Sequence, residues 1–193
     1  MQTSDLPREL LGLPVLTVLP PWGTAIARWG KGYENRGRPP PASYKGKRLG
    51  IHQGQLGTYP DGRLRSDERA RAVSSAIAGL ISEGLIPTPK DNRVDEIMRA
   101  RAQVVADAGR LLAIATVADA LEVDHDHAVS LWETPGRHVE LDPWMIPGQV
   151  AWRLTDLEPL TEPILLSGLQ GIWRLTHERR LAALQAQEKR ATR

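Results

Sequence analysis

A nearly continuous apolar run, Leu111–Val117 (LLAIATV), lies in the middle of a chain of 193 residues that also contains 15 prolines and 17 glycines. Such a run is typical of a strand that is buried on both faces at the centre of a sheet. Because prolines and glycines end helices and strands, we expect the elements around this strand to be short. The run therefore predicts a sheet with a buried central strand.

Shorter segments with β-forming character occur before and after this run. They are Val15–Leu19, Lys47–Gln53, Gln149–Leu157 and Gly171–Leu175. Residues 125–148 lack such a pattern, and we expect them to be irregular. The predicted strands lie far apart in the sequence, so the sheet must pair segments that are not neighbours along the chain.

Helical patterns lie between these strands. A short helix is expected over about Trp22–Trp29, where Pro21 suits the first turn. Two longer amphipathic segments, Asp67–Glu83 and about Asn92–Gly109, predict an αα-hairpin inserted between strands. Residues 177–192 favour a C-terminal helix by propensity. Together, these strands and helices place the chain in the α+β class.

The composition excludes several classes of protein. The chain has no cysteine, which rules out disulfide frameworks, thiolate zinc sites, iron–sulfur clusters and cysteine nucleophiles. No stretch approaches the roughly 18 consecutive apolar residues that a membrane span needs. The N-terminal segment does not have the pattern of a secretory signal. We therefore expect a cytoplasmic protein with no membrane partner.

The charges are unevenly distributed, although 25 Lys and Arg against 23 Asp and Glu leave a net charge of only +2. Residues 28–48 contain seven basic side chains and a single acid, Glu34. Residues 119–142 reverse this balance, with seven acids and one base, Arg137. A basic segment of this kind can bind a polyanion, but runs of charge also occur on solvated surfaces.

The hexapeptide KGYENR at 31–36, preceded by Pro-Trp, resembles the signature of the ASCH domain family. That signature is Gly-x-Lys-x-x-Glu-x-Arg, with Pro-Trp upstream of the lysine. Lys31, Glu34 and Arg36 match it, whereas Trp29 stands at the position of the signature glycine. Later segments resemble the family in the same order. They are Tyr44-Lys45-Gly46, Ile51-His52, Leu112–Asp124, Gln149–Leu154, Leu157–Leu160 and Gly168–Trp173.

The resemblance implies a PUA-like fold, a small mixed β-barrel with flanking helices, here with the inserted αα-hairpin. It also implies that Lys31, Glu34 and Arg36 line the ligand cleft of the family. The domain boundaries follow from where the resemblance begins and ends. Residues 1–13 form a lead-in, residues 14–176 the ASCH-like domain with a helical insertion at 57–109, and residues 177–193 a basic C-terminal helix or tail.

The chemistry of the three signature side chains suits a nucleotide. In an extended stretch Glu34 and Arg36 point to the same side, so they can share a cleft with Lys31. Arg36 offers bidentate donors for a phosphate or a guanine edge, and Lys31 is a compact cation for a phosphate or a developing oxyanion. Glu34 can accept from a base amino group or act as a general base. A purely structural ion pair is the alternative interpretation.

Further candidates for nucleic-acid binding flank these three residues. Trp22 and Tyr44 can stack on bases, although packing in the core is the alternative role for Trp22. Trp29, beside a glycine, is a further exposed aromatic candidate. Three more basic residues are expected to hold phosphates. They are Lys45, Lys47 and Arg48.

His52 and the segment Asp124–His127 lead to two further hypotheses. His52 can serve as a proton donor opposite Glu34, the acid–base pair that RNA transesterification requires, or it can be a structural histidine. The sequence DHDH at 124–127 has spacing that suits a metal ion, but no third ligand follows at a suggestive distance. We therefore predict neither a metal site nor a cofactor.

Three classes of function remain open. The first is a nucleic-acid-binding module that prefers RNA or single-stranded DNA and, as the resemblance implies, reads a modified or flipped-out base near Glu34. The second is an ASCH-type hydrolase. It would be a ribonuclease that uses Lys31, Glu34 and His52, or an acylcytidine amidohydrolase, whose family nucleophile is a threonine at the position of Glu34. The third is an adaptor that docks a protein partner on the helical insertion. The sequence does not predict an oligomeric state.

Overall fold

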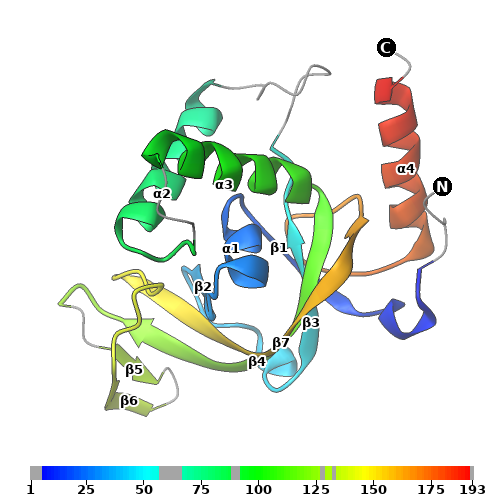
Figure 1. The fold of residues 1–193 in the computed structure, drawn as a ribbon. Coiled ribbons are helices and arrows are strands. Elements are labelled where there is room, and N and C mark those ends of the chain that lie inside the picture. The colour runs from blue at the N-terminus through cyan, green and yellow to red at the C-terminus, as the bar shows by residue number, and fades with distance from the viewer. Residues whose placement is uncertain (1–5, 57–66, 88–91, 127–128, 132–133, 192–193) are drawn as a thin grey trace.

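The computed structural model describes residues 6–56, 67–87, 92–126, 129–131 and 134–191. These residues form an α+β protein in which a curled sheet is combined with four helices (Figure 1). The strands are β1 (Pro14–Val18), β2 (Tyr33–Arg36), β3 (Arg48–Gln53), β4 (Arg110–Val123), β5 (Val129–Leu131), β6 (Thr134–Val139), β7 (Gln149–Leu165) and β8 (Gly171–Arg174). The helices are α1 (Trp22–Arg28), α2 (Asp67–Ser82), α3 (Arg93–Asp107) and α4 (His177–Ala191), with 3₁₀ turns at Arg8–Leu10 and Ala42–Tyr44.

Six of the strands form a mixed half-barrel in the order β2-β7-β4-β3-β1-β8, and β5 and β6 extend it beside β4. Neighbouring strands are antiparallel except β1 and β3, which are parallel. The curl brings β2, at one end of this order, close to β1 near the other end. Arg36 on β2 donates from Nη2 to the carbonyl oxygen of Thr17 on β1 at 2.9 Å.

No backbone pairing joins β2 to β1 or β8 in the described part of the chain, so the half-barrel is open along one line. We call this opening, between β2 on one side and the paired strands β1 and β8 on the other, the seam. The side chain of Arg36 crosses it.

The apolar run Leu111–Val117 lies in β4, between β3 and β7. Leu111, Ala113 and Ala115 have no exposed surface, because sheet neighbours and side chains of both faces cover them. The prediction of a buried central strand is confirmed, and β4 continues to Val123, beyond the apolar run.

β7 is longer than the sequence predicts, because it continues past two prolines to Leu165. Its pairing with β4 is irregular: two residues of β7, Asp156 and Leu157, form a β-bulge opposite Ala115, and residues 160–163 lie opposite Leu112. Asp156 has a φ of 48°, an unusual backbone conformation for a residue other than glycine. The expectation that residues 125–148 are irregular is wrong in part, because β5 and β6 form a hairpin within them.

Helix α1 lies inside the curl of the sheet and contacts β1, β2, β3, β4 and β7 (Figure 1). Ile26 has no exposed surface and packs into the core of the half-barrel, whereas Ala25, which is equally buried, packs on the other side of α1 in a cluster with α2 and α3. The close approach of α1 to β3 requires Gly23, since a Cβ atom there would lie 2.8 Å from the Cβ of Gln53. Because β2 follows α1 after a short turn, this buried helix fixes where the signature residues begin.

Helices α2 and α3 form the expected adjacent pair, and α3 contacts α1 (Figure 1). Their apolar stripes, which include Val73, Ile77 and Val104, are buried in one cluster with residues of α1. The stripes thus complete the core of the protein itself, and the large apolar side chains of the pair that remain exposed are Val94 and Met98. No helix in the described ranges has both the length and the apolar character that crossing a membrane would require.

Candidate functional site

A cavity of about 600 Å³ opens at the seam. Its walls come from β1, the start of α1, β2 and the end of β3, together with residues just before β7 and β8. Five residues singled out from the sequence line it: Trp22, Lys31, Glu34, Arg36 and His52. The fold therefore gathers the three signature side chains in one place that a ligand can enter.

Lys31 is turned towards the cavity by the backbone at the end of α1. Gly30 has a φ of 79°, which reverses the chain, and the Lys31 N–H donates to the carbonyl oxygen of Ala25 at 3.1 Å. The left-handed conformation favours glycine because a Cβ atom strains it. Gly30 thus provides the turn at the end of the helix.

The ammonium group of Lys31 is almost completely buried, with 2% of the residue exposed. It donates to the carbonyl oxygen of Tyr33 and lies 5.9 Å from the centre of the Trp22 ring. Burial lowers the pKa of Lys31 to about 8, while the carboxylates of Glu34 and Asp142 act in the opposite direction. Lys31 is therefore a cation at neutral pH that titrates at moderately alkaline pH.

Glu34 and Arg36 point into the cavity from alternate positions of β2. Glu34 is buried and forms an ion pair with Arg36, in which Oε1 and Nε are 3.0 Å apart. Burial raises the pKa of Glu34, and the charges of Lys31 and Arg36 partly counteract this effect. The Arg36 guanidinium, on a side chain 29% exposed, also lies 5.9 Å from the centre of the Trp152 ring.

His52 closes the cavity from the end of β3 and belongs to a short polar chain. Trp173 Nε1 donates to Thr17 Oγ1 at 2.9 Å, and Thr17 Oγ1 lies 3.2 Å from His52 Nδ1. A hydroxyl has one proton and two lone pairs, so Thr17 can accept from Trp173 and either donate to Nδ1 or accept from it. Within the described ranges, Nε2 is buried and has no hydrogen-bond partner.

The surroundings of His52 keep its ring neutral. Burial lowers the pKa of His52 to about 4, although the backbone of Leu166 and of Gly109 acts in the opposite direction. Gly168 packs directly on the ring, since a Cβ atom there would lie 2.3 Å from His52 Cε1. At neutral pH the side chain is therefore an uncharged donor and not a source of protons for an acid catalyst.

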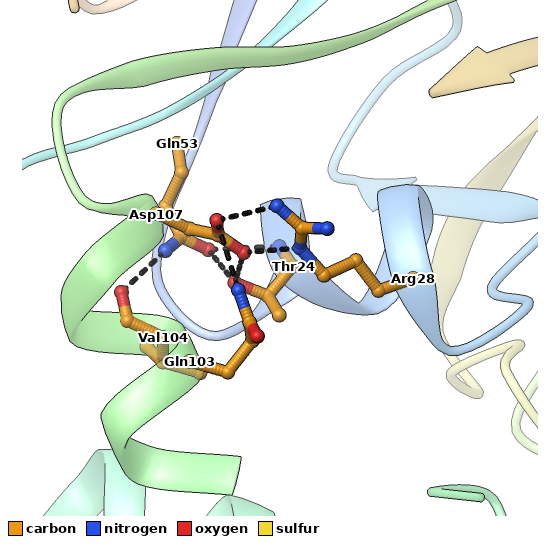
Figure 2. A network of polar contacts seen from close by, with 6 residues as sticks. All are labelled: Thr24, Arg28, Gln53, Gln103, Val104 and Asp107. Carbon is orange, nitrogen blue, oxygen red and sulfur yellow. Dashed lines mark hydrogen bonds and ion pairs between the residues drawn. The ribbon is translucent and has the colours of Figure 1, made fainter. Parts of the chain in front are cut away.

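A largely buried polar network joins α1, the end of β3 and α3 (Figure 2). Asp107 at the end of α3 accepts from Arg28 Nε and Nη2, both at 2.9 Å, which ties α3 to α1. Gln53, which follows His52, accepts from the Thr24 backbone N–H at 2.9 Å and donates to the carbonyl oxygen of Val104 at 2.9 Å. The inserted helix pair is thus connected to both α1 and β3, which carry cavity residues at their ends.

The mouth of the cavity is partly apolar, and the exposed glutamines Gln55 and Gln170 line it as well. Three large hydrophobic side chains that line it are exposed: Leu19 at 72%, Leu169 at 50% and Ile146 at 39%. They come from three separate segments, after β1, before β8 and before β7. A charged interior with a partly apolar rim suits a ligand that has both a flat apolar surface and polar edges.

The remaining basic and aromatic candidates lie outside this cavity. Lys45, Lys47 and Arg48 are exposed, and Arg48 pairs with Glu158 at 2.5 Å. Arg48 begins β3 whereas His52 lies near its end, so the rise of about 3.3 Å per residue separates them by roughly 13 Å. Tyr44 is half-buried and lines a second hollow.

Trp22 combines its two predicted roles, since it is half-buried against the α2–α3 cluster and also lines the cavity. Trp29 packs on the same cluster and is not an exposed stacking surface. Sequence reasoning did not identify Thr17 or the rim residue Leu19 as part of the site. Gly168–Trp173 was singled out only as a segment that resembles the family, and nothing local in the sequence indicates that Gly168 covers His52.

The segment 124–127 that was considered for a metal lies only partly within the described residues, because His127 falls outside them. No group of three or more potential metal-ligating side chains occurs in the part of the chain that the structure describes. No protein-family model matches the chain, and no curated protein matches it in sequence.

Proposed function

We propose that the protein is a nucleic-acid-binding module of the ASCH type, with a PUA-like fold, that holds one unpaired nucleotide of an RNA or single-stranded DNA in the cavity at the seam. The observation that carries this proposal is the convergence of Lys31, Glu34 and Arg36 in a cavity of about 600 Å³ beside Trp22. The open half-barrel, with α1 inside its curl, supports the fold assignment.

The polar groups of the cavity match the edges of a nucleotide. Glu34 accepts from a base amino group, and Arg36 donates to base or phosphate oxygens. Lys31 supplies a buried positive charge, whose effect on an anion is stronger than at the surface because less water screens it. The volume lies within the roughly 300–1,000 Å³ of typical ligand pockets.

The depth of these groups favours an unpaired base. Lys31 and Glu34 are buried below the surface, where the edges of a base within a duplex cannot reach. A base must therefore leave its stack to contact them. The exposed apolar rim of Leu19, Ile146 and Leu169 can replace part of the stacking that the neighbouring bases lose.

Fluorescence anisotropy with labelled mixed-sequence RNA, single-stranded DNA and duplex DNA over a range of salt concentrations tests this proposal. We expect RNA and single-stranded DNA to bind more tightly than the duplex, with log K falling linearly with log salt as counterions are released. Lys31→Met should weaken binding about 30-fold or more, whereas Lys47→Met, which removes an exposed lysine outside the cavity, should change it less than threefold. Equal effects of the two substitutions, or no salt-sensitive binding to any of the three probes, would overturn the proposal.

The raised pKa of Glu34 supports a second candidate function, an RNA hydrolase in which this carboxylate is the general base. The neutral His52 is a poor proton donor at neutral pH, so this enzyme would need another acid. Incubation of end-labelled RNA with the protein and with Lys31→Ala distinguishes the two functions. Cleavage by the wild type that the variant lacks would establish a hydrolase, and intact RNA with both would establish a binder alone.

A further inference from the structure

A second hollow, of about 950 Å³, lies on the other side of Arg36 from the cavity. Arg36 lines both spaces. The second hollow is bounded by Arg38, the proline loop 39–41 and the rings of Tyr44 and Trp152. None of these residues lines the cavity described above.

Both spaces lie along the seam. Each has β2 or the residues after it on one side, and β1 with β8 or the residues just before it on the other. The cavity uses Thr17 and residues 168–170, whereas the hollow uses the adjoining Leu16, Gly171 and Ile172. The two spaces are therefore consecutive positions along one line, and Arg36 is the side chain between them.

Arg36 has donors left for a ligand at this crossing. A guanidinium carries five N–H groups. Nε faces Glu34 and one N–H of Nη2 binds the Thr17 carbonyl oxygen, whereas within the described ranges Nη1 has no partner. A phosphate at the crossing would accept from the Nη1 side of a guanidinium that two protein contacts already hold in position.

The second hollow differs in charge from the cavity. Among its described lining residues there is no carboxylate, whereas the cavity contains Glu34. Arg38 is exposed and forms no ion pair with any described side chain, so its charge is available to a phosphate. Its backbone carbonyl oxygen accepts from Trp152 Nε1 at 2.8 Å, which fixes the loop to the sheet. The half-buried ring of Tyr44 offers a face on which a base can stack.

We infer that this hollow is a second nucleotide subsite, which takes the neighbouring nucleotide of the same single strand, with Arg36 holding the phosphate between the two. The inference rests on the proposed function of the cavity and extends it from one nucleotide to a strand that follows the seam. The cavity distinguishes the base through its buried polar groups. The hollow adds affinity through Arg38, Tyr44 and the shared Arg36, with little selection among bases.

The test compares an equimolar mixture of ribonucleoside 5′-monophosphates with a mixed pool of 5′-phosphorylated dinucleotides, by isothermal titration calorimetry. Stacking on one aromatic ring and one further phosphate contact predict that the dinucleotides bind about tenfold more tightly than the monophosphates. Arg38→Ala combined with Tyr44→Ala should remove this advantage and leave monophosphate affinity unchanged, because neither side chain lines the cavity. Lys47→Ala is the matched control, since it removes an exposed cation that lines neither space.

The outcomes separate the two claims. Equal affinity of the wild type for the two pools, or an equal loss for both pools in the double variant, overturns the second subsite and leaves the cavity intact. No binding of the monophosphates, with dinucleotide binding that Lys31→Met leaves unchanged, overturns the proposed function of the cavity itself. The double variant should keep the circular dichroism spectrum and melting temperature of the wild type, because Arg38 is exposed and Tyr44 is only half-buried.

Discussion

Raising the pH from 7 to 9.5 should weaken nucleotide binding by way of Lys31. The ammonium group is buried, and its pKa is lowered to about 8 in the free protein. If the bound anion requires the charged form, the complex keeps the proton that the free protein loses, so affinity falls as the pH rises. The fall approaches tenfold per pH unit above pH 8, which amounts to about 30-fold at pH 9.5.

The assay is fluorescence anisotropy at constant ionic strength, with an oligonucleotide of adenine and cytosine only, because these bases lose no proton in this range. Lys31→Met is the matched variant, since it has a similar length and no titratable group. It should bind more weakly at pH 7 and show an almost flat profile up to pH 9.5. Flat binding by the wild type, or an equally steep fall in the variant, would refute the assignment of the pH dependence to Lys31.

Three further predictions concern stability and packing. The pKa of His52 is about 4 in the folded protein and about 6.5 in the unfolded chain, so the unfolded chain binds a proton that the folded protein does not. About 3 kcal/mol of stability is therefore lost as the pH falls through this range. Urea denaturation at pH 7 and pH 4.5 should show a smaller loss of stability in His52→Gln than in the wild type, and an identical loss would contradict the assignment of the effect to His52. Asp107→Ala leaves Arg28 without its bidentate partner and should lower the free energy of unfolding by about 2–3 kcal/mol. This loss corresponds to a drop in melting temperature of roughly 4–12 °C. An unchanged melting temperature would show that the network of Figure 2 does not stabilise the fold. Gly168→Ala places a methyl group against the His52 ring and should cost about 1–3 kcal/mol, whereas Gly32→Ala, where a Cβ atom meets nothing within 4 Å, is the control that should cost much less.

The parts of the site that could be predicted from the sequence are those that local geometry determines. Lys31, Glu34 and Arg36 follow one short helix and one turn, so their convergence depends on α1, the left-handed Gly30 and the alternation of β2. The sequence indicates His52 as a candidate proton donor or structural histidine, but the neutral state of its ring could not be predicted. That state results from burial beneath Gly168, which comes from the other end of the chain.

The contacts that could not be predicted depend on how distant strands pair. Thr17 enters the site because β1 lies beside both β3 and β8, and because the sheet curls far enough for Arg36 to reach it. Conversely, Lys45 and Lys47 are close to Arg36 in sequence but lie outside the cavity, since the chain leaves the seam before β3 begins. The prediction based on proximity along the chain therefore made the basic surface at the site too large.

In the fold, too, the local elements could be predicted from the sequence, whereas the contacts between distant elements could not. The apolar stripes of α2 and α3 predict a helix pair, but not that its apolar side would pack on α1 and on Trp22. The prolines in β7 favour an early end to the strand, whereas its pairing with β4 continues past them to Leu165 with shifts in register.

The most direct measurement of where a nucleotide binds is ultraviolet cross-linking of a bound single-stranded RNA, followed by mass spectrometry to identify the attached residues. Binding in the cavity predicts cross-links in the segments that surround it, foremost at Trp22 and around Leu169, and their loss in Lys31→Met. Cross-links confined to residues 45–48 or to the basic helix α4, and unaffected by Lys31→Met, would contradict it.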